Sequence, residues 1–484
     1  MKRILFALLL CMVLFSCSKD YFGSPLYWDA ANWEGEPTQS EKYTDYGENP
    51  FVKAAEEPQS TFGIDADGGS YSNTRRFVNL GQLPPKESVR IEEYINYFTF
   101  DYPEPTSENV SINTEASTCP WNSEHLLLRI GLKGKSLDKN EIGPSNFVFL
   151  IDVSGSMSSP DKLEMLKSGF KMLVDEMNDD DRIAIVTYAS SDKVILKSTS
   201  CSDKTKIKRA IGQLGSGGST AGARGIITAY EIAEENFIEG GNNRIIIGSD
   251  GDFNVGPSSN EELVSLIEEK RETGIYLTVL GVGQGNLNDS MMEQLANNGN
   301  GNYEYIDNVD QLKKVFIYEK QKFYTVAKDC KIQVTFNPNS VDAYRLIGYE
   351  NRVLSNEDFE KDTVDAGEIG AGQTITAFYE LIPSENPVEE FCTLQFRYKK
   401  PNETTSILLE HDAIGNYIAF ENASENMKFG AAIVGFGLMM KESEYKGDAN
   451  WSAISDWGNS ALGADEFGFR KELMELVENA QSIE

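Results

Sequence analysis

The sequence has few histidines, few cysteines and far fewer basic than acidic residues. Its 484 residues include two histidines and six cysteines with no CxxC pair, so histidine-based catalytic sets have few candidates and the usual zinc-site patterns have none. Lys and Arg number 44 against 76 Asp and Glu, which gives a formal net charge of −32. A field of that sign repels phosphate groups, so binding to nucleic acid or to anionic lipid headgroups is disfavoured.

Long apolar runs are also missing. The run at residues 4–15 is shorter than the roughly 20 residues that a spanning helix needs, and it follows Lys2 and Arg3, which is typical of a secretory signal peptide. The sequence Leu-Phe-Ser-Cys that ends at Cys17 resembles the lipobox of bacterial lipoproteins. This resemblance implies a lipid anchor at Cys17. We therefore expect a lipid-anchored protein of the cell envelope, at the outer membrane.

Apart from Cys11 and Cys17 at the N-terminus, four cysteines remain, and they are far apart in the sequence. They are expected to be mostly free, buried thiols, and they are Cys119, Cys201, Cys330 and Cys392.

Strand and helix patterns alternate between residues 146 and 326. Strands are predicted at 146–152, 182–189, 193–199, 243–249, 276–282 and 302–306. Helices are predicted at 161–177, 203–213, 221–237, 259–272, 288–297 and 308–325. Since parallel strands need crossover connections, this order predicts a Rossmann-like α/β fold with a mainly parallel sheet covered by helices on both faces.

The flanking regions have different patterns. Strand-like runs occur at 110–116 and 125–132, and residues 327–415 alternate with period two, which predicts an antiparallel β-sandwich. We expect the two earlier runs to complete that sandwich, so that the α/β domain is inserted into a β domain. Residues 416–484 are predicted to be helical, and the apolar stretch FGAAIVGFGLMM there is too short for a membrane span, which favours a buried core helix.

These patterns divide the chain into six predicted parts. They are a signal peptide at 1–16, a tether at 17–60, helices with strands at 61–145, the α/β domain at 146–326, the β-sandwich at 327–415 and the helical region at 416–484.

The first strand of the α/β domain ends in oxygen-bearing side chains. In FVFLIDVSGSMSSPDK, residues 147–162, the apolar run is followed by Asp152, Ser154 and Ser156. Alone this pattern is weak, because Asp and Ser are common at turns and Ser159 before a proline would cap the next helix.

Two further elements strengthen the pattern. Thr220 opens a predicted helix after two glycines, and Asp250 ends another apolar strand. Ligands of parallel sheets bind beyond the carboxyl ends of the strands, so these side chains could converge with the first set. Short oxygen side chains around one point suit a hard divalent cation.

The five residues resemble the metal-ion-dependent adhesion site (MIDAS) of von Willebrand factor type A (vWA) domains in order, spacing and strand context. Segments such as RRFVNLGQLPP (75–85) and NNRIIIGSDGDFNVG (242–256) extend the similarity from about residue 48 to the C-terminus, where the chain resembles the YfbK-like family of bacterial vWA lipoproteins. The resemblance implies that Mg²⁺, or Mn²⁺ or Ca²⁺, is bound by Asp152, Ser154, Ser156, Thr220 and Asp250.

The charges of this set indicate what the metal would do. Only Asp152 and Asp250 are charged, so the cation stays under-neutralised and can accept an Asp or Glu side chain from a protein partner. An enzyme is disfavoured: His125 and His411 lie outside the α/β domain, no GxSxG motif or P-loop occurs, and Asp252 is more typical of a turn than of a catalytic base. A structural or assembly scaffold, in which the metal only stabilises the fold, remains the alternative.

Overall fold

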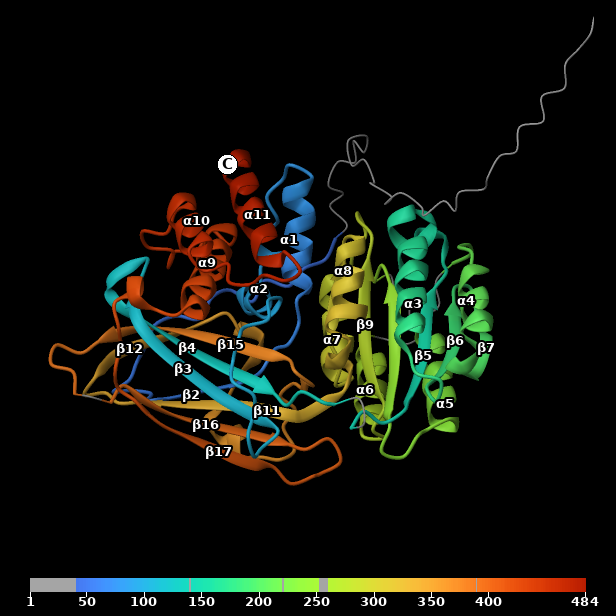
Figure 1. Ribbon diagram of the computed structural model, residues 1–484, viewed down its shortest axis with the longest axis horizontal. Coiled ribbons are helices and arrows are strands. Elements are labelled where there is room, and N and C mark those ends of the chain that lie inside the picture. The colour runs from blue at the N-terminus through green and yellow to red at the C-terminus, as the bar shows by residue number, and fades with distance from the viewer. Residues whose placement is uncertain (1–40, 139–140, 220–221, 252–259, 389) are drawn as a thin grey trace, which may run out of the picture. The chain divides into compact units, whose positions relative to one another are not determined.

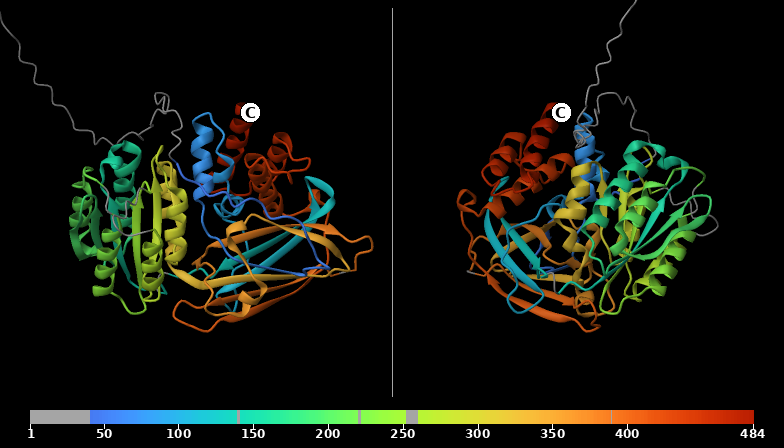
Figure 2. Two further views of the ribbon diagram at one scale, coloured as in Figure 1. Left: turned by 180° about the vertical axis from the view of Figure 1, so that it is seen from behind. Right: turned by 45° about the vertical axis from the view of Figure 1, so that its right-hand side comes forward.

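The structure is a computed structural model that describes residues 41–138, 141–219, 222–251, 260–388 and 390–484 (Figures 1 and 2). The predicted signal peptide, the lipidation site Cys17, the metal ligand Thr220 and the alternative base Asp252 lie outside these residues.

A six-stranded sheet forms the centre of the α/β domain, in the order β10-β9-β8-β5-β6-β7. Its strands are β5 (Ser145–Asp152), β6 (Arg182–Tyr188), β7 (Asp192–Ser200), β8 (Asn242–Ser249), β9 (Tyr276–Val282) and β10 (Tyr303–Ile306). All neighbouring strands are parallel except the edge strand β7, which runs antiparallel to β6. The predicted mainly parallel sheet is confirmed.

Helices cover both faces of this sheet (Figure 1). They are α3 (Met165–Glu176), α4 (Lys204–Gly212), α5 (Gly222–Glu235), α6 (Asn260–Arg271), α7 (Asp289–Asn298) and α8 (Val309–Lys313). Alternate residues of β5 enter two different cores: Phe149 packs in the core that contains α3, and Leu150 packs in the one that contains α5. A strand buried on both faces needs a continuous apolar run, which explains the sequence of β5.

The helix predicted at 308–325 is wrong in its length. The chain forms α8, then a π-helical turn (Lys314–Tyr318) and a 3-10 turn (Lys320–Phe323). Lys314 and Lys322 are buried and both form ion pairs with Glu319. This change of direction brings both lysines to the carboxylate of Glu319. In a straight helix, Lys314 and Lys322 would be eight positions apart and could not both reach it.

A β-sandwich is built from two antiparallel sheets, with strand orders β1-β12-β15-β4-β3 and β13-β2-β11-β16-β17. Its longer strands are β3 (Val110–Cys119), β4 (Asn122–Gly134), β11 (Thr325–Phe336), β12 (Val341–Ile347), β15 (Thr374–Pro383), β16 (Cys392–Lys399) and β17 (Ile407–Ile414). The short strands are β1 (Val52–Lys53), β2 (Gln59–Gly63), β13 (Val353–Leu354) and β14 (Ile369–Gly370), of which β14 pairs with β11. Because β4 pairs with β15, the strands before residue 145 do complete the sandwich, as predicted.

The tether predicted at 17–60 extends too far along the chain. Strand β1 pairs with β12, β2 pairs with β11, and Glu41 forms a 2.9 Å ion pair with Arg76. Residues 41–60 therefore belong to the folded part. Strands as short as β1 have too few residues to show an alternating pattern, so the sequence alone could not reveal them.

Five helices share a further core. They are α1 (Gly69–Asn79), α2 (Ile91–Asn96), α9 (Glu425–Met440), α10 (Trp451–Asn459) and α11 (Phe469–Ile483). Helix α9 is buried around its whole circumference, which confirms the predicted core helix. Within the described residues, no helix combines the length and apolar character needed to cross a bilayer. Cys119, Cys201, Cys330 and Cys392 are free and buried, as expected.

Candidate metal site

Two aspartates lie at the carboxyl ends of neighbouring strands. Strands β5 and β8 are parallel, with Ile151 opposite Gly248; Asp152 is the last residue of β5 and Asp250 follows β8 directly. The chain leaves β5 for β6 on one side and later returns to β8 on the other. Ligand sites of open α/β sheets form at this kind of reversal in strand order, so the position agrees with the predicted site.

Asp152 is fully buried and both its oxygens accept hydrogen bonds. Oδ1 accepts the backbone N–H of Ser154 at 2.8 Å, and Oδ2 accepts the hydroxyl of Ser249 at 3.2 Å. Burial raises the pKa of Asp152 to about 6, and the charge of Asp250 adds to the rise while the hydrogen bonds from Ser154 and Ser249 oppose it. A cation beside Asp152 would stabilise its charged form.

The two predicted serines lie beside this carboxylate. The Oγ atoms of Ser154 and Ser156 are 2.9 Å apart, and the hydroxyl of Ser156 also forms a hydrogen bond with Asp250. Ser154 is buried and Ser156 is half-buried. Four of the five predicted ligands are therefore brought together, and they supply oxygen atoms only, which is the donor set that Mg²⁺ prefers.

The segment before the fifth predicted ligand is fixed to the first loop. The backbone N–H of Gly217 donates to the carbonyl of Val153 at 2.7 Å, and the N–H of Gly155 donates to the carbonyl of Gly218 at 2.9 Å. Thr220 itself lies outside the described residues, so its place among the ligands stays a prediction.

Sequence reasoning missed a lysine that contacts the second aspartate. Nζ of Lys162 lies 3.0 Å from Oδ2 of Asp250 and 2.7 Å from Oδ1 of Asn286, whose amide nitrogen donates to the same Oδ2 at 3.0 Å. Burial alone would raise the pKa of Asp250, but the charge of Lys162 and the hydrogen bonds from Asn286 and Ser156 hold it below its usual value. Asp250 is therefore compensated inside the protein, whereas Asp152 is not.

One signal could have pointed to Lys162. It precedes Leu163 in a turn that packs on the sheet, and both residues are buried. A buried lysine needs a partner, since an unpaired buried charge is costly.

The cap expected at Ser159 is wrong. Ser159 takes the N-cap position of the turn over Pro160–Glu164 but makes no side-chain capping bond. Its buried Oγ has no hydrogen-bond partner among the residues that the structure describes.

Residues before the first strand hold the loop that carries Asn286. Glu41 Oε1 accepts the N–H of Gly285 at 2.7 Å, and the N–H of Lys42 donates to the carbonyl of Leu287 at 2.9 Å. The two histidines lie elsewhere, on β4 and β17 of the sandwich, as the sequence indicated.

Family models match most of the chain in three parts. Residues 37–129 match a family described as von Willebrand factor, and residues 146–317 match the von Willebrand factor type A domain. Residues 321–389 and 384–483 match the family described as "Uncharacterized protein YfbK, C-terminal".

Known proteins resemble the chain to different extents. It is 40% identical over 471 residues to "Uncharacterized protein YfbK" of Escherichia coli K12, covering 91% of this chain and 81% of that protein. It is 26% identical over 189 residues to "Uncharacterized protein sll0103" of Synechocystis, covering 39% and 44%. The solved structure "von Willebrand factor type A from Catenulispora acidiphila" is 15% identical with a TM-score of 0.44, covering 77% of this chain and 91% of that one, a likeness that supports no conclusion about function.

Proposed function

Because this chain belongs to the YfbK family and carries a vWA domain, we propose that it binds a protein partner through a divalent cation held by that domain. Domains of this type are mostly interaction modules rather than enzymes. The cation would be Mg²⁺, or Mn²⁺ or Ca²⁺, and the partner would present an Asp or Glu side chain.

One observation carries the proposal. Asp152 and Asp250 lie at adjacent strand ends with the hydroxyls of Ser154 and Ser156 between them, and all four side chains offer oxygen. Thr220 would be the fifth ligand. Two carboxylates can at most neutralise a divalent cation, and one that acts through water neutralises it less. Such an ion can accept a further anionic oxygen from outside, so the site suits an acidic side chain.

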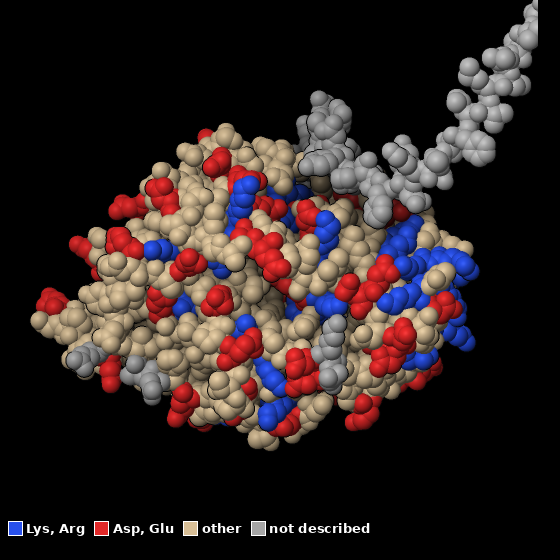
Figure 3. All heavy atoms as spheres, viewed as in Figure 1, with Lys and Arg blue, Asp and Glu red and all other residues tan. Residues whose placement is uncertain are grey.

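The net charge of −32 does not repel an acidic partner equally over the whole surface. Lys and Arg side chains gather on one side of the α/β domain (Figure 3). On α4, Lys206 and Arg209 are exposed, and Lys204 and Lys208 are half-buried. The carboxyl end of α4 leads into the segment that contacts Val153 and Gly155. An acidic partner that approaches the site would meet this basic region, which supports its association.

The place of the protein in the cell is proposed from its leader. The short apolar run after Lys2 and Arg3 and the lipobox-like end at Cys17 favour export followed by lipidation. We place the protein in the cell envelope, anchored by lipid, with the outer membrane as the expected site.

Metal binding and partner binding can be tested together. Calorimetry should detect Mg²⁺ or Mn²⁺ binding to the purified protein, and crosslinking in cells followed by mass spectrometry should identify partners. Those partners should be lost from a pulldown when EDTA is added. A protein that binds no divalent cation, or partners that stay bound in EDTA, would contradict the proposal.

A scaffold role is a second candidate with an observation of its own. The ion pair between Lys162 and Asp250 already supplies an internal cation to half of the site. A fold that is stable without metal would serve a scaffold equally well, and in that case EDTA should leave every partner in the pulldown.

A further inference from the structure

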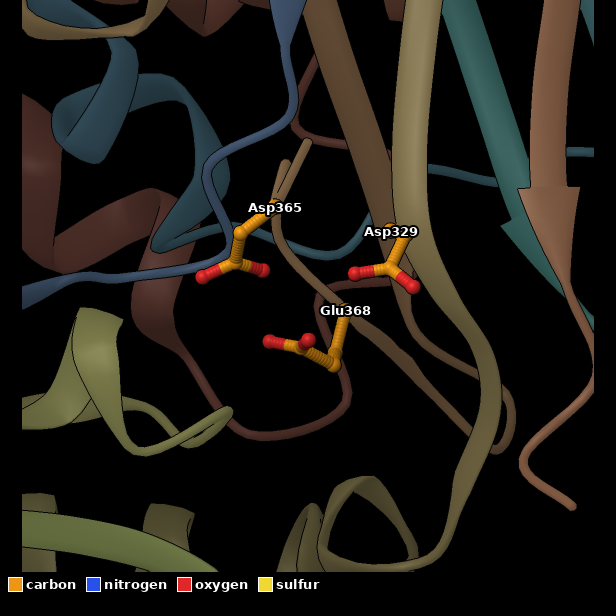
Figure 4. Close-up of side chains that lie close together, drawn as sticks. All are labelled: Asp329, Asp365 and Glu368. Atoms are coloured by element: carbon orange, nitrogen blue, oxygen red, sulfur yellow. The ribbon is translucent and has the colours of Figure 1, made fainter. Parts of the chain in front are cut away.

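Three carboxylates converge away from the vWA metal site. Asp329, Asp365 and Glu368 each offer one oxygen, and the three oxygens lie within 4.8 Å of one another (Figure 4). Asp329 comes from β11, and the other two come from the loop between a 3-10 turn (Asn356–Glu360) and β14. We call this set the joint cluster.

Backbone hydrogen bonds hold these two segments together. The N–H of Cys330 donates to the carbonyl of Gly367 at 3.0 Å, and the N–H of Ile64 donates both to the carbonyl of Cys330 at 3.1 Å and to that of Ala366 at 3.0 Å. The pairing of β11 shifts its register between Lys328 and Lys331, and Asp329 has a φ of +52° at this irregularity. The joint cluster is thus fixed by the sandwich itself rather than by the reach of flexible side chains.

Two of the three carboxylates have a cation as partner. Lys399 Nζ lies 2.7 Å from Oδ2 of Asp329, and Arg271 at the end of α6 forms an ion pair with Oδ2 of Asp365. No described residue donates a hydrogen bond to the Oδ1 atom of either aspartate. Each of these side chains therefore keeps one oxygen for a further ligand.

No residue in the described part of the chain forms an ion pair with the third carboxylate, Glu368. Glu368 is 9% exposed, and its buried Oε1 has no hydrogen-bond partner among the described residues. Burial, with the negative charges of Asp365 and Asp329, raises the pKa of Glu368 well above its usual value, and the charges of Arg271 and Arg352 oppose this rise only in part. A buried carboxylate without a partner is costly, and a bound cation would remove that cost.

A small cavity adjoins the same glutamate. It is lined by Glu368 together with Asp67 and Arg352 and has a volume of about 10 Å³, which is close to the space of one water molecule. Oδ2 of Asp67 is also buried without a partner among the described residues. An ion at the joint cluster could therefore keep a water ligand.

We propose that the joint cluster binds one Ca²⁺ ion, which fastens the β-sandwich to the vWA domain. Ca²⁺ takes six to eight oxygen ligands in flexible geometry and is often bound by several carboxylates. Mg²⁺ demands near-octahedral geometry, keeps several of its waters and is usually bound by only one or two carboxylates, so three convergent carboxylates favour Ca²⁺. Through Asp365 the ion is linked to Arg271 of the vWA domain, so it lies where the two parts meet.

The test separates this site from the vWA metal site by working in the Asp152→Ala background. Full-length protein with that change should still bind one Ca²⁺ by calorimetry, and Ca²⁺ should raise its melting temperature relative to EDTA. Adding Glu368→Gln or Asp329→Asn should weaken Ca²⁺ binding by about tenfold or more, because each removes a charged ligand. Adding Glu360→Gln, which neutralises an exposed glutamate nearby, should leave the affinity and the melting temperature unchanged.

Two results would overturn the inference. One is an Asp152→Ala protein that neither binds Ca²⁺ nor gains melting temperature from it. Glu368 would then be protonated, and the joint cluster would hold no metal. The other is an equal response with and without Glu368→Gln. Neither result bears on the proposed partner site, which is tested by comparing the wild-type protein with Asp152→Ala.

Discussion

The two candidate metal sites of this chain are built from different chemical groups. The vWA site combines two aspartates with serine hydroxyls, and only Asp250 has an internal cation, Lys162 at 3.0 Å. The joint cluster has three carboxylates and no hydroxyl, and two of the three have internal cations. Each set keeps one carboxylate without an ion-pair partner among the described residues, Asp152 in the vWA site and Glu368 in the joint cluster, so the sites differ in donor type rather than in net charge. Carboxylates alone suit a structural Ca²⁺ ion, and carboxylates mixed with neutral hydroxyls suit a cation that takes a further anionic ligand.

The two sites also differ in the backbone structure around their ligands. The vWA ligands follow the ends of parallel strands, where loops converge on open space. The joint cluster lies at a register shift of an antiparallel strand and is covered by a loop hydrogen-bonded to it. Exposure does not separate the two sites in this way: Asp152 and Asp250 are fully buried, whereas the side chains of Asp329 and Asp365 are 16% and 28% exposed.

The largest effect is expected from Asp152→Ala. This change removes the one carboxylate of the vWA site that has no internal cation, so Mg²⁺ affinity should fall by at least about 100-fold, given that even supporting groups are worth roughly 10–100-fold. Calorimetry with Mg²⁺ measures the loss. The melting temperature in EDTA should change little, because removal of a buried, uncompensated carboxylate offsets the loss of its hydrogen bonds with Ser154 and Ser249.

Asp180→Ala is the matched control, because Asp180 is exposed and precedes β6, at the opposite end of the sheet. Mg²⁺ affinity that is unchanged in Asp152→Ala would rule out Asp152 as a ligand. A retained Ca²⁺ response in the same variant would sharpen the comparison, since it would come from the joint cluster alone.

A smaller effect of opposite sign is expected from Lys162→Met. The ammonium group lies 3.0 Å from Asp250 and repels any cation bound there, so its removal should raise Mg²⁺ affinity by about tenfold. Without metal, the loss of the buried cation beside Asp250 should destabilise the fold by about 3–5 kcal/mol, measured as the free energy of unfolding in EDTA. If Lys162→Met instead weakened Mg²⁺ binding, the lysine would be a support for the ligands rather than a competitor of the metal.

The sequence predicts that Asp152 and Asp250 lie close together because both mark the ends of apolar strands. Asp152 and Asp250 each close a run of buried residues, and a parallel sheet brings such ends together whatever the loops do. Lys162 and Asn286 could not be predicted in the same way. They reach Asp250 from a turn and a loop whose directions depend on tertiary packing.

The joint cluster has no signal in the sequence. Asp329 has a positive φ and Glu368 follows a glycine with a positive φ, so neither carboxylate closes a regular apolar run. Their meeting depends on the hydrogen bonds that join residues 64, 330, 366 and 367 across three segments of the sandwich. The same kind of long-range pairing placed β1 and β2 in the fold, where the sequence predicted a tether.

The smallest effect is expected from Arg271→Gln at the joint cluster. Arg271 compensates Asp365 much as Lys162 compensates Asp250, so its removal should strengthen Ca²⁺ binding in the Asp152→Ala background. The side chain of Arg271 is 16% exposed against 7% for Lys162, and water screens the more exposed charge more strongly. We therefore expect a gain of about threefold rather than tenfold. A calorimetric gain as large as that of Lys162→Met would show that water screens the two charges equally, and the contrast between the two sites would then rest on their ligands alone.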